Sequence, residues 1–204
     1  MARTVDPEKH AAKRQHILDC AAALFAEQGY DGATTSQLCA RAGISPGKLY
    51  HYFSGKKQVF LAVLTQDEQH THALLNALTA QLRPLEALLR FVSHLAEPAA
   101  ADPVVPRLVL EAMLQAHRDP EIGAELQRVE AAEEEGLRIL LGRAMEAGEV
   151  DPTLTVDGAA SWIGALVNAV YLQAALTADF DPAQQAANLR RTVRAFLAPL
   201  ASTC

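Results

Sequence analysis

Two helix-start signals with one glycine between them restrict how the chain folds after residue 33. Thr34 is followed three residues later by Gln37, the spacing of a capping box, in which each side chain satisfies a backbone N–H group of the other residue. Ser45 precedes Pro46, which suits the first position of a helix because its missing N–H would have no partner there. Gly43 can end the first helix in a left-handed conformation. The pattern predicts two short helices joined by a tight turn, a helix-turn-helix.

The rest of the chain also has the apolar periodicity and composition of helices. Ala, Leu, Glu, Gln and Arg are frequent, and strand-forming residues outside helical patterns are scarce. We predict an all-α fold with a three-helix N-terminal helix-turn-helix domain and six or so helices after it. Residues 1–10 are expected to form a flexible arm and residues 97–106 a loop. The expected helices span residues 13–28, 34–42, 45–53, 54–78, 85–95, 106–117, 120–147, 156–178 and 182–200.

Positive charge is concentrated in the first 60 residues. They contain eight Lys and Arg against five Asp and Glu, whereas the remainder has ten Arg and nineteen acidic residues. The formal net charge of the whole chain is −6. Because a positive surface attracts phosphate groups, we expect the N-terminal third, and not the acidic remainder, to meet a nucleic acid.

The second short helix has the residues to enter the major groove of DNA, which accommodates an α-helix. Gly47 has no side chain and allows close approach of the backbone, and Lys48 can reach a guanine edge or a phosphate. Tyr50, His51 and Tyr52 combine rings with polar tips. Alternatively, His51 is an ordinary surface histidine with no contact to DNA.

Lys56 and Lys57 lie in the first turn of the next expected helix, where the helix dipole disfavours cations by roughly a few tenths of a kcal/mol. An external anion would explain both lysines, since the backbone N–H groups at this helix end also bind anions. We therefore predict that Lys56 above all contacts a DNA phosphate.

A series of residues between positions 12 and 71 has a specific order and spacing: Ile17-Leu18, Ala21, Leu24-Phe25, Gly29-Tyr30, Thr34-Thr35, Ala42-Gly43-Ile44-Ser45, Leu49-Tyr50, Tyr52-Phe53, Lys56 and Phe60. In this series the segment resembles the DNA-binding domain of the TetR family of transcriptional regulators. Together with the caps and charges above, the resemblance implies a set of DNA-binding residues. These are Thr34, Thr35, Ser36, Ser45, Pro46, Gly47, Lys48, Tyr50, His51, Tyr52, Lys56 and Lys57.

Two positions depart from the usual pattern of the family. Lys57 stands where an acidic residue is common and could strengthen phosphate binding, and Lys48 stands where a small polar residue is common. The operator sequence therefore cannot be transferred from relatives.

The resemblance also implies how the whole chain is organised. Residues 1–60 would form the DNA-binding domain and residues 61–204 an effector-binding and dimerisation domain. The implied protein is a cytoplasmic homodimer without a cofactor, most simply a repressor that a small-molecule effector releases from a near-palindromic double-stranded operator. The effector would change the placement of the helix after the helix-turn-helix and with it the separation of the two heads.

The second domain contains candidates for an effector pocket, because such pockets are mainly apolar with a few polar groups. The candidates are Phe91, Met113, His117, Trp162, Asn168 and Tyr171. Taken singly, each residue of this kind is more often part of the core than a ligand contact. The small residues Ala160, Gly164, Ala165 and Ala169 would let two helices approach closely, as in a four-helix dimer interface with the final helix.

Other features have simpler interpretations. Glu130 and the run Glu133–Glu135 predict a solvated helix face, with attraction of a cationic effector as the alternative. The uncharged stretch 158–178 is long enough to cross a bilayer, but its polar residues and flanking aspartates favour a packed helix and no membrane. The three cysteines, Cys20, Cys39 and Cys204, are widely spaced, which predicts reduced thiols and a reducing compartment.

Two other classes of function stay open beside the ligand-released regulator. One is a ligand-independent DNA-organising or protein-interaction module that uses the same DNA-binding head. The other is a helical enzyme, which we do not expect, because no paired carboxylates, nucleophile–base set, phosphate-binding glycine loop or metal-ligand spacing supports it.

Overall fold

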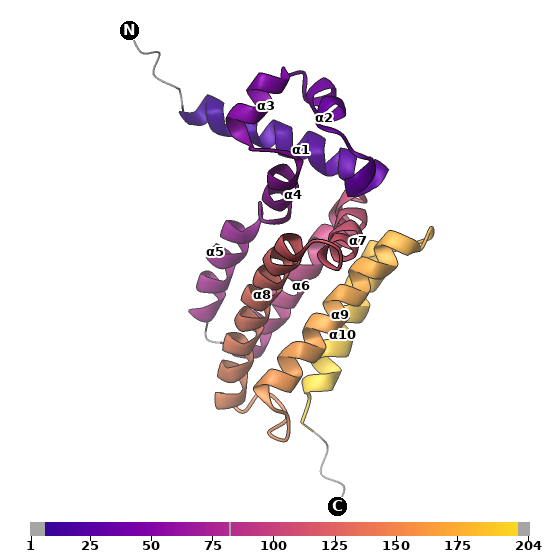
Figure 1. The fold of residues 1–204 in the computed structure, drawn as a ribbon. Helices are drawn as coiled ribbons and strands as arrows, with labels where there is room; N and C mark the ends of the chain where they lie inside the picture. Colours follow the sequence, from indigo (N-terminus) through magenta and orange to yellow (C-terminus); the bar gives the residue numbers. More distant parts are fainter. Residues whose placement is uncertain (1–6, 82, 200–204) are drawn as a thin grey trace, which may run out of the picture. The chain divides into compact units, whose positions relative to one another are not determined.

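The computed structural model describes residues 7–81 and 83–199, and these residues form an all-helical fold (Figure 1). The helices are α1 (Pro7–Gly32), α2 (Thr35–Ala42), α3 (Pro46–Tyr52), α4 (Lys56–Leu64), α5 (Glu68–Thr79), α6 (Pro84–Ala101), α7 (Val104–Ala116), α8 (Pro120–Glu146), α9 (Val156–Leu176) and α10 (Pro182–Leu197). The predicted fold class is therefore confirmed. Cys204 and residues 1–6 lie outside the described residues.

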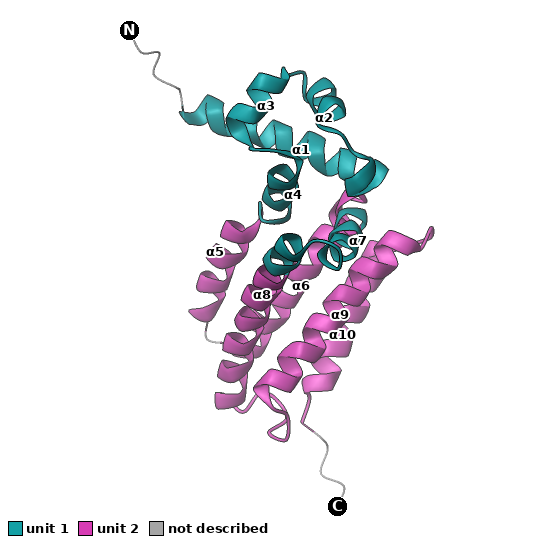
Figure 2. Cartoon of the chain, in the orientation of Figure 1, with its two compact units in different colours: residues 1–66, 107–126 teal, residues 67–106, 127–204 magenta. Residues whose placement is uncertain are grey.

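The helices group into two compact units (Figure 2). Unit 1 comprises Met1–Gln66 and Arg107–Leu126, and unit 2 comprises Asp67–Pro106 and Gln127–Cys204, as far as these ranges are described. The helix-turn-helix thus shares its unit with α7 and the first turns of α8. The expected functional division at residue 60 differs from this grouping and stays a prediction.

The helix-turn-helix forms as its local signals predict. The Thr34 side chain accepts the backbone N–H of Gln37, and the Gln37 side chain accepts the backbone N–H of Thr34, which completes the capping box. Gly43 ends α2 in the left-handed conformation with φ 61°. The Ser45 hydroxyl accepts the N–H of Lys48 at the start of α3.

Unit 1 has its own apolar core. The buried face of α1 consists of Ile17, Leu18, Ala21, Leu24 and Phe25. It packs with buried residues of the other helices of the unit: Leu38, Ala42, Leu49, Phe53, Val59, Phe60, Val63, Leu108, Ala112 and Ile122. The short helices α2 and α3 are therefore held by burial of one side of each, which isolated helices of seven or eight residues would lack.

The expected boundaries are wrong at both ends of α1 and at the end of α6. Residues 7–10 belong to α1 and not to a flexible arm, and α1 continues past a turn at Gly29 with φ 71°. Residues 97–101 belong to α6 and not to a loop. Ala96 and Ala99 are buried there, and packing together with the high helix propensity of alanine outweighs the helix-breaking effect of Pro98.

The long helix expected over residues 54–78 is two helices, α4 and α5. The N-cap of α4 is Gly55, so no side chain caps the start of this helix. The break follows Thr65, whose hydroxyl donates to the carbonyl of Leu61. Val59 and Phe60 pack into the core of unit 1, whereas Leu78 packs into the core of unit 2. The two halves therefore serve different cores.

Unit 2 is built around α6, which contacts α5, α9 and α10. Its buried face includes Leu88, Leu89, Phe91 and Val92. α8 passes close to this face at Gly136, because a Cβ atom there would lie 2.8 Å from the Phe91 ring and 3.2 Å from the Leu75 side chain.

We predict that Gly136→Ala destabilises the protein by about 1–3 kcal/mol, since the added methyl overpacks a filled core. Gly142→Ala, on the same helix, is the matched control, because a Cβ there meets nothing within 4 Å. That control should stabilise the protein by roughly 0.5–1 kcal/mol through helix propensity. Urea unfolding of both variants checks this, and equal midpoints would contradict the close approach.

Candidate nucleic-acid interface and ligand cavities

α3 is the helix predicted to enter the major groove, here called the recognition helix, and it exposes most of the residues predicted to contact DNA. Lys48, Tyr50 and His51 are exposed, and 56 % of Tyr50 is accessible, whereas Leu49 between them is buried. A Cβ at Gly47 would meet nothing within 4 Å, so the backbone there is open to close approach. α3 therefore divides its residues between the core and the surface.

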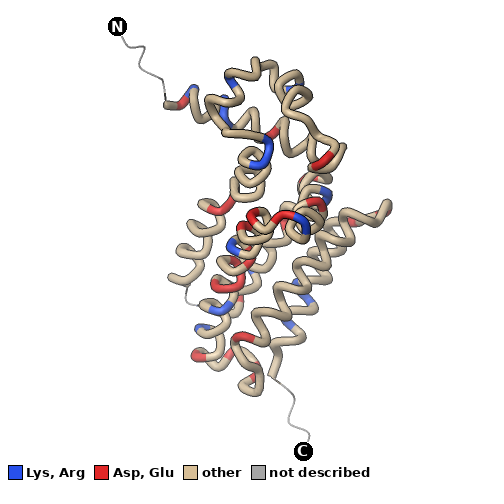
Figure 3. The backbone as a smooth tube through the Cα atoms, viewed as in Figure 1, with Lys and Arg blue, Asp and Glu red and all other residues tan. Residues whose placement is uncertain are grey.

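The start of α2 offers a second group of exposed polar side chains in the same unit. Thr34 and Ser36 are exposed and Thr35 is partly buried. Ser45 and Pro46, at the start of α3, are exposed as well. Figure 3 shows basic residues along the N-terminal helices and several acidic residues along α8.

Two residues of α1 contact the C-terminal end of α3. The ring of His10 lies 4.6 Å from the ring of Tyr52 and 6.0 Å from that of His51, measured between centroids. The guanidinium carbon of Arg14 lies 5.2 Å from the centroid of the Phe53 ring. The end of the recognition helix is thus in contact with the first turns of α1.

Lys56 has partners inside unit 1. Its Nζ donates to the carbonyl oxygens of Tyr30 at 2.7 Å and Ala33 at 3.1 Å, and it lies 4.3 Å from the centroid of the Tyr30 ring. This ammonium group satisfies carbonyls at the end of α1. Its position at a helix start therefore needs no external anion, and its contact with a phosphate stays a prediction.

Lys57 is also paired within unit 1. Its Nζ lies 2.7 Å from a carboxylate oxygen of Glu121 and 2.9 Å from one of Asp119. The hydrogen bond to Glu121, followed by that to Asp119, raises the pKa of Lys57, and Lys57 in turn lowers the pKa of Asp119. This pairing could not be predicted from the sequence, because the partners lie more than sixty residues away. Its contact with DNA also stays a prediction.

Glu111 of α7 is a further residue that sequence reasoning missed. Its carboxylate accepts the backbone N–H of Tyr30 at 2.8 Å and the Nε2 of Gln115 at 3.0 Å. The N–H of Tyr30 follows the turn at Gly29, so Glu111 supplies the partner that the interrupted helix does not. α7 thereby fixes the end of α1.

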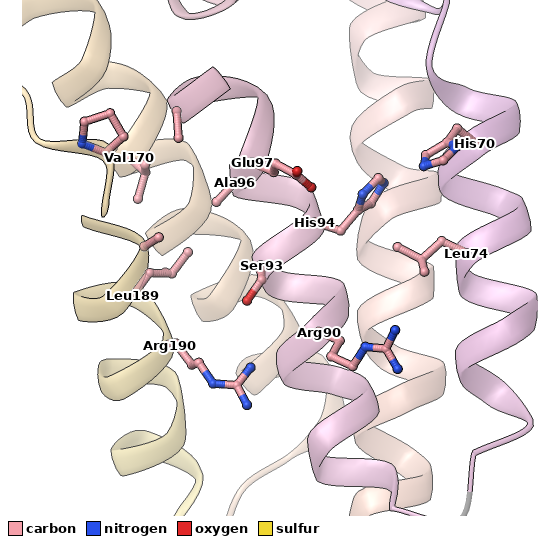
Figure 4. A pocket seen from close by; sticks show the side chains of 13 residues that line it. His70, Leu74, Arg90, Ser93, His94, Ala96, Glu97, Val170, Leu189 and Arg190 are labelled. Carbon is pink, nitrogen blue, oxygen red and sulfur yellow. The ribbon is translucent and has the colours of Figure 1, made fainter. Parts of the chain in front are cut away.

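A cavity of about 580 Å³ lies over α6 in unit 2 (Figure 4). It is lined by His70, Leu74, Arg90, Ser93, His94, Ala96, Glu97, Ala100, Val170, Pro182, Ala186, Leu189 and Arg190. The His70 and His94 ring centroids are 5.4 Å apart, and burial, with a smaller effect of His70, lowers the pKa of His94. Arg190 is held by Glu86 at 2.7 Å. This volume lies within the range of small-molecule sites.

A second cavity of about 280 Å³ lies between α8 and α9 and is lined partly by carboxylates. Its acidic residues are Glu130, Glu133 and Glu134, and Glu134 pairs with Arg138 at 2.8 Å. Burial, together with repulsion from Glu130 and Glu68, raises the pKa of Glu133 to about 7. The expectation that this run only forms a solvated face is therefore wrong for Glu133, which is partly buried.

The six predicted pocket residues do not line one cavity. Phe91 is buried in the core of unit 2, and Tyr171 is partly buried with its hydroxyl donating to the carbonyl of Leu95. Asn168 lines the smaller cavity, whereas Trp162 is 53 % exposed. Met113 and His117 belong to unit 1. The polar residues of α6 were missed because a polar stripe on a helix usually indicates only a solvated face.

α9 combines apolar composition with low burial. Among the described helices it alone is long and apolar enough to cross a membrane. Core helices of soluble proteins also have this length and composition, so the match is weak evidence for a membrane span. In the structure, 22 % of its most apolar window is buried. Trp162, Leu172 and Leu176 are exposed large apolar residues on it. Exposed apolar residues gathered on one helix are typical of a surface that binds another protein.

Comparison with known proteins agrees with these features. Residues 17–63 match the family model of bacterial regulatory proteins of the tetR family, and residues 84–198 match that of the C-terminal part of BetI-type transcriptional repressors. The transcriptional regulator UidR of Escherichia coli K12 is 29 % identical over 145 residues, 69 % of this chain and 70 % of UidR. The repressor AcnR of Corynebacterium efficiens is 30 % identical over 150 residues, 74 % of this chain and 75 % of AcnR.

The fold is also found among solved structures. FadR from Bacillus subtilis, solved in complex with stearoyl-CoA, superposes with a TM-score of 0.77 at 19 % identity. The match covers 90 % of this chain and 98 % of FadR. At this identity the match establishes the fold.

We predict that Glu133→Gln removes part of the pH dependence of stability. A carboxyl whose folded-state pKa is raised from 4.5 to about 7 holds its proton more tightly in the folded state. Its contribution is therefore complete below about pH 4.5 and is lost as the pH rises through about 7. Relative to wild type, the variant should gain stability between pH 5 and pH 8.

Urea unfolding at both pH values measures this difference. Glu146→Gln is the matched control, since Glu146 is exposed on the same helix. The idea fails when Glu133→Gln and Glu146→Gln change with pH by the same amount.

Proposed function

Because the chain belongs to the TetR family of transcriptional regulators, we propose that it is a repressor that binds a near-palindromic operator as a homodimer and is released by a small-molecule effector. The observation that carries the proposal is the helix-turn-helix, whose second helix keeps Leu49 in the core and exposes Lys48, Tyr50 and His51.

In this proposal α3 lies in the major groove. Lys48 contacts a guanine edge or a phosphate, and Tyr50 contacts base edges or thymine methyl groups. His51 and Tyr52 lie at the end of the same helix, and Gly47 allows the backbone to approach. Thr34, Thr35 and Ser36, with Ser45 and Pro46, contact the phosphate backbone at the two helix starts.

Lys56 and Lys57 have a second role in this proposal, as weaker phosphate contacts. An ammonium group has three N–H bonds, and two carbonyls occupy two of those of Lys56. Lys57 keeps 38 % of its side chain exposed beside its two carboxylates. Both lysines can therefore face a phosphate without losing their internal partners.

Dimerisation through α9 is supported by its exposed apolar residues and by small residues such as Gly164 and Ala165. Two copies would place their recognition helices in successive major grooves, about 34–36 Å apart. A helix with Trp162, Leu172 and Leu176 exposed is better explained by burial against a second copy than by contact with a membrane.

Effector binding is supported by the two cavities of unit 2 and by the similar fold of FadR, which was solved with stearoyl-CoA. An effector shifts DNA binding only when its affinity differs between two arrangements of the protein. We place the protein in the cytoplasm, where operator DNA and metabolites are both present.

Tyr50→Ala and Lys56→Ala should weaken DNA binding in different ways. A duplex is first selected from a random pool with the wild-type protein, and a shuffled duplex serves as the non-specific reference. Loss of Tyr50 should cost about 1–3 kcal/mol on the selected duplex and much less on the shuffled one. Loss of Lys56 should weaken both and lower the salt slope by about one.

Titrations at several salt concentrations measure both effects. An equal loss on the two duplexes would remove Tyr50 from base recognition, and an unchanged salt slope would limit Lys56 to its internal role. Failure to select any duplex at low salt would overturn the proposed function.

Trp162→Ala should weaken the dimer. A tryptophan at the centre of an interface typically contributes 2 kcal/mol or more, so the dissociation constant should rise about 30-fold. Leu114→Ala is the control, because Leu114 is also an exposed apolar residue but lies on α7 in unit 1. Sedimentation over a dilution series measures the change, and the same dissociation constant in both variants would argue against α9 as the interface.

A further inference from the structure

The first two turns of α1 contact the last residues of the recognition helix through four side chains. His10 and Arg14 are four residues apart, so they project from the same face of α1. Their partners Tyr52 and Phe53 are consecutive and end α3. His10 lies against Tyr52 and Arg14 against Phe53.

The contact at Tyr52 is a cluster of three rings. The planes of His10 and Tyr52 are tilted by 33°, while His51 meets Tyr52 edge-on at 81° with centroids 5.4 Å apart. His10 also meets His51 edge-on at 81°. Each ring therefore restricts the rotation of the other two.

The core of unit 1 also holds this end of α3, since Phe53 is buried in it and Tyr52 packs against it. It is seven residues long, and its C-cap is Phe53, whose N–H bonds to the carbonyl of Leu49. Leu49 is the helix's one fully buried residue, and it lies at the centre of the helix. In addition to this core packing, the exposed His51 and the partly buried Tyr52 are in contact with the His10 ring.

We propose that His10 is a positioning residue for operator recognition: its ring fixes Tyr52, and with it His51, in the orientation in which α3 meets the operator. The inference rests on the proposed DNA-binding function. Arg14 has the same role for Phe53 and so for the end of the helix. His10 itself need not touch DNA.

The role of His10 can be measured with the wild-type-selected duplex and the shuffled duplex. Full-length His10→Ala should bind the selected duplex about two- to tenfold more weakly, the range expected for loss of a ring pair. Its affinity for the shuffled duplex should change by less than about twofold. His10→Phe, which keeps a ring without a charge, should recover most of the loss. His72→Ala, an exposed histidine of α5, is the control and should bind like wild type.

A double-mutant cycle separates positioning from direct contact. When His10 acts through Tyr52, His10→Ala should add little further loss in the Tyr52→Ala background. A full additional loss there would overturn the proposal, as would an equal loss on both duplexes or no loss in His10→Ala. Failure of His10→Phe to recover binding would also overturn it, and this variant keeps the test valid when His10→Ala folds poorly.

The outcomes differ for the role of His10 and for the proposed DNA-binding function on which it rests. Wild-type protein that selects no duplex overturns the proposed function and the inference with it. Wild-type protein that selects a duplex, which His10→Ala then binds equally well, overturns the role of His10 alone.

Discussion

The ammonium group of Lys56 joins the end of α1 to the start of α4, and the arrangement of unit 1 depends on this bond. The turn at Gly29 interrupts α1. Lys56 therefore donates to the carbonyls of Tyr30 and Ala33, and Glu111 accepts the N–H of Tyr30. Around the same point the rings of Phe25, Tyr30 and Phe60 lie with centroids 4.9–5.9 Å apart. Polar and aromatic contacts thus hold the end of α1 against the start of α4, and α2 and α3 lie between these two helices in the sequence.

This junction explains why cations occupy the start of α4 despite the unfavourable helix dipole. A few tenths of a kcal/mol are lost to the dipole, whereas a buried carbonyl without a donor costs roughly 1–3 kcal/mol. The ion pairs with Asp119 and Glu121 offset the unfavourable position of the Lys57 charge at the helix start. Asp119 also accepts the backbone N–H groups of Glu121 and Ile122 in the first turn of α8. A residue pattern that looks like a site for an external ligand can therefore arise from internal packing.

Features encoded within a few residues could be predicted from the sequence, and features that depend on distant partners could not. The caps at Thr34 and Ser45 and the turn at Gly43 form as expected, because each needs only its neighbours. The break after Thr65 was missed, since it depends on which core each half of the segment joins. The apolar faces of α1 and α4 were predictable from periodicity, whereas the ion pairs of Lys57 join residues more than sixty positions apart.

In the candidate sites, too, features encoded by neighbouring residues could be predicted, whereas features that depend on distant residues could not. The exposure of Lys48, Tyr50 and His51 follows from helix periodicity once Leu49 is assigned to the core. The cavities of unit 2 depend on how α6 lies among its neighbours, which sequence periodicity does not specify, so residues such as Arg90 and His94 were missed.

α8 contributes to both units and so connects the two parts of the proposed function. Its first turn carries Glu121, which holds Lys57, and its later turns carry Glu130 and Glu133 beside the smaller cavity. A partly buried Glu133 with a pKa raised to about 7 is poorly solvated in its charged form, so a ligand that supplies positive charge or hydrogen bonds would stabilise that form. These residues belong to the same helix as Glu121, which pairs with Lys57. In the proposed function, regulation requires that the affinity of the effector differs between two arrangements of the protein.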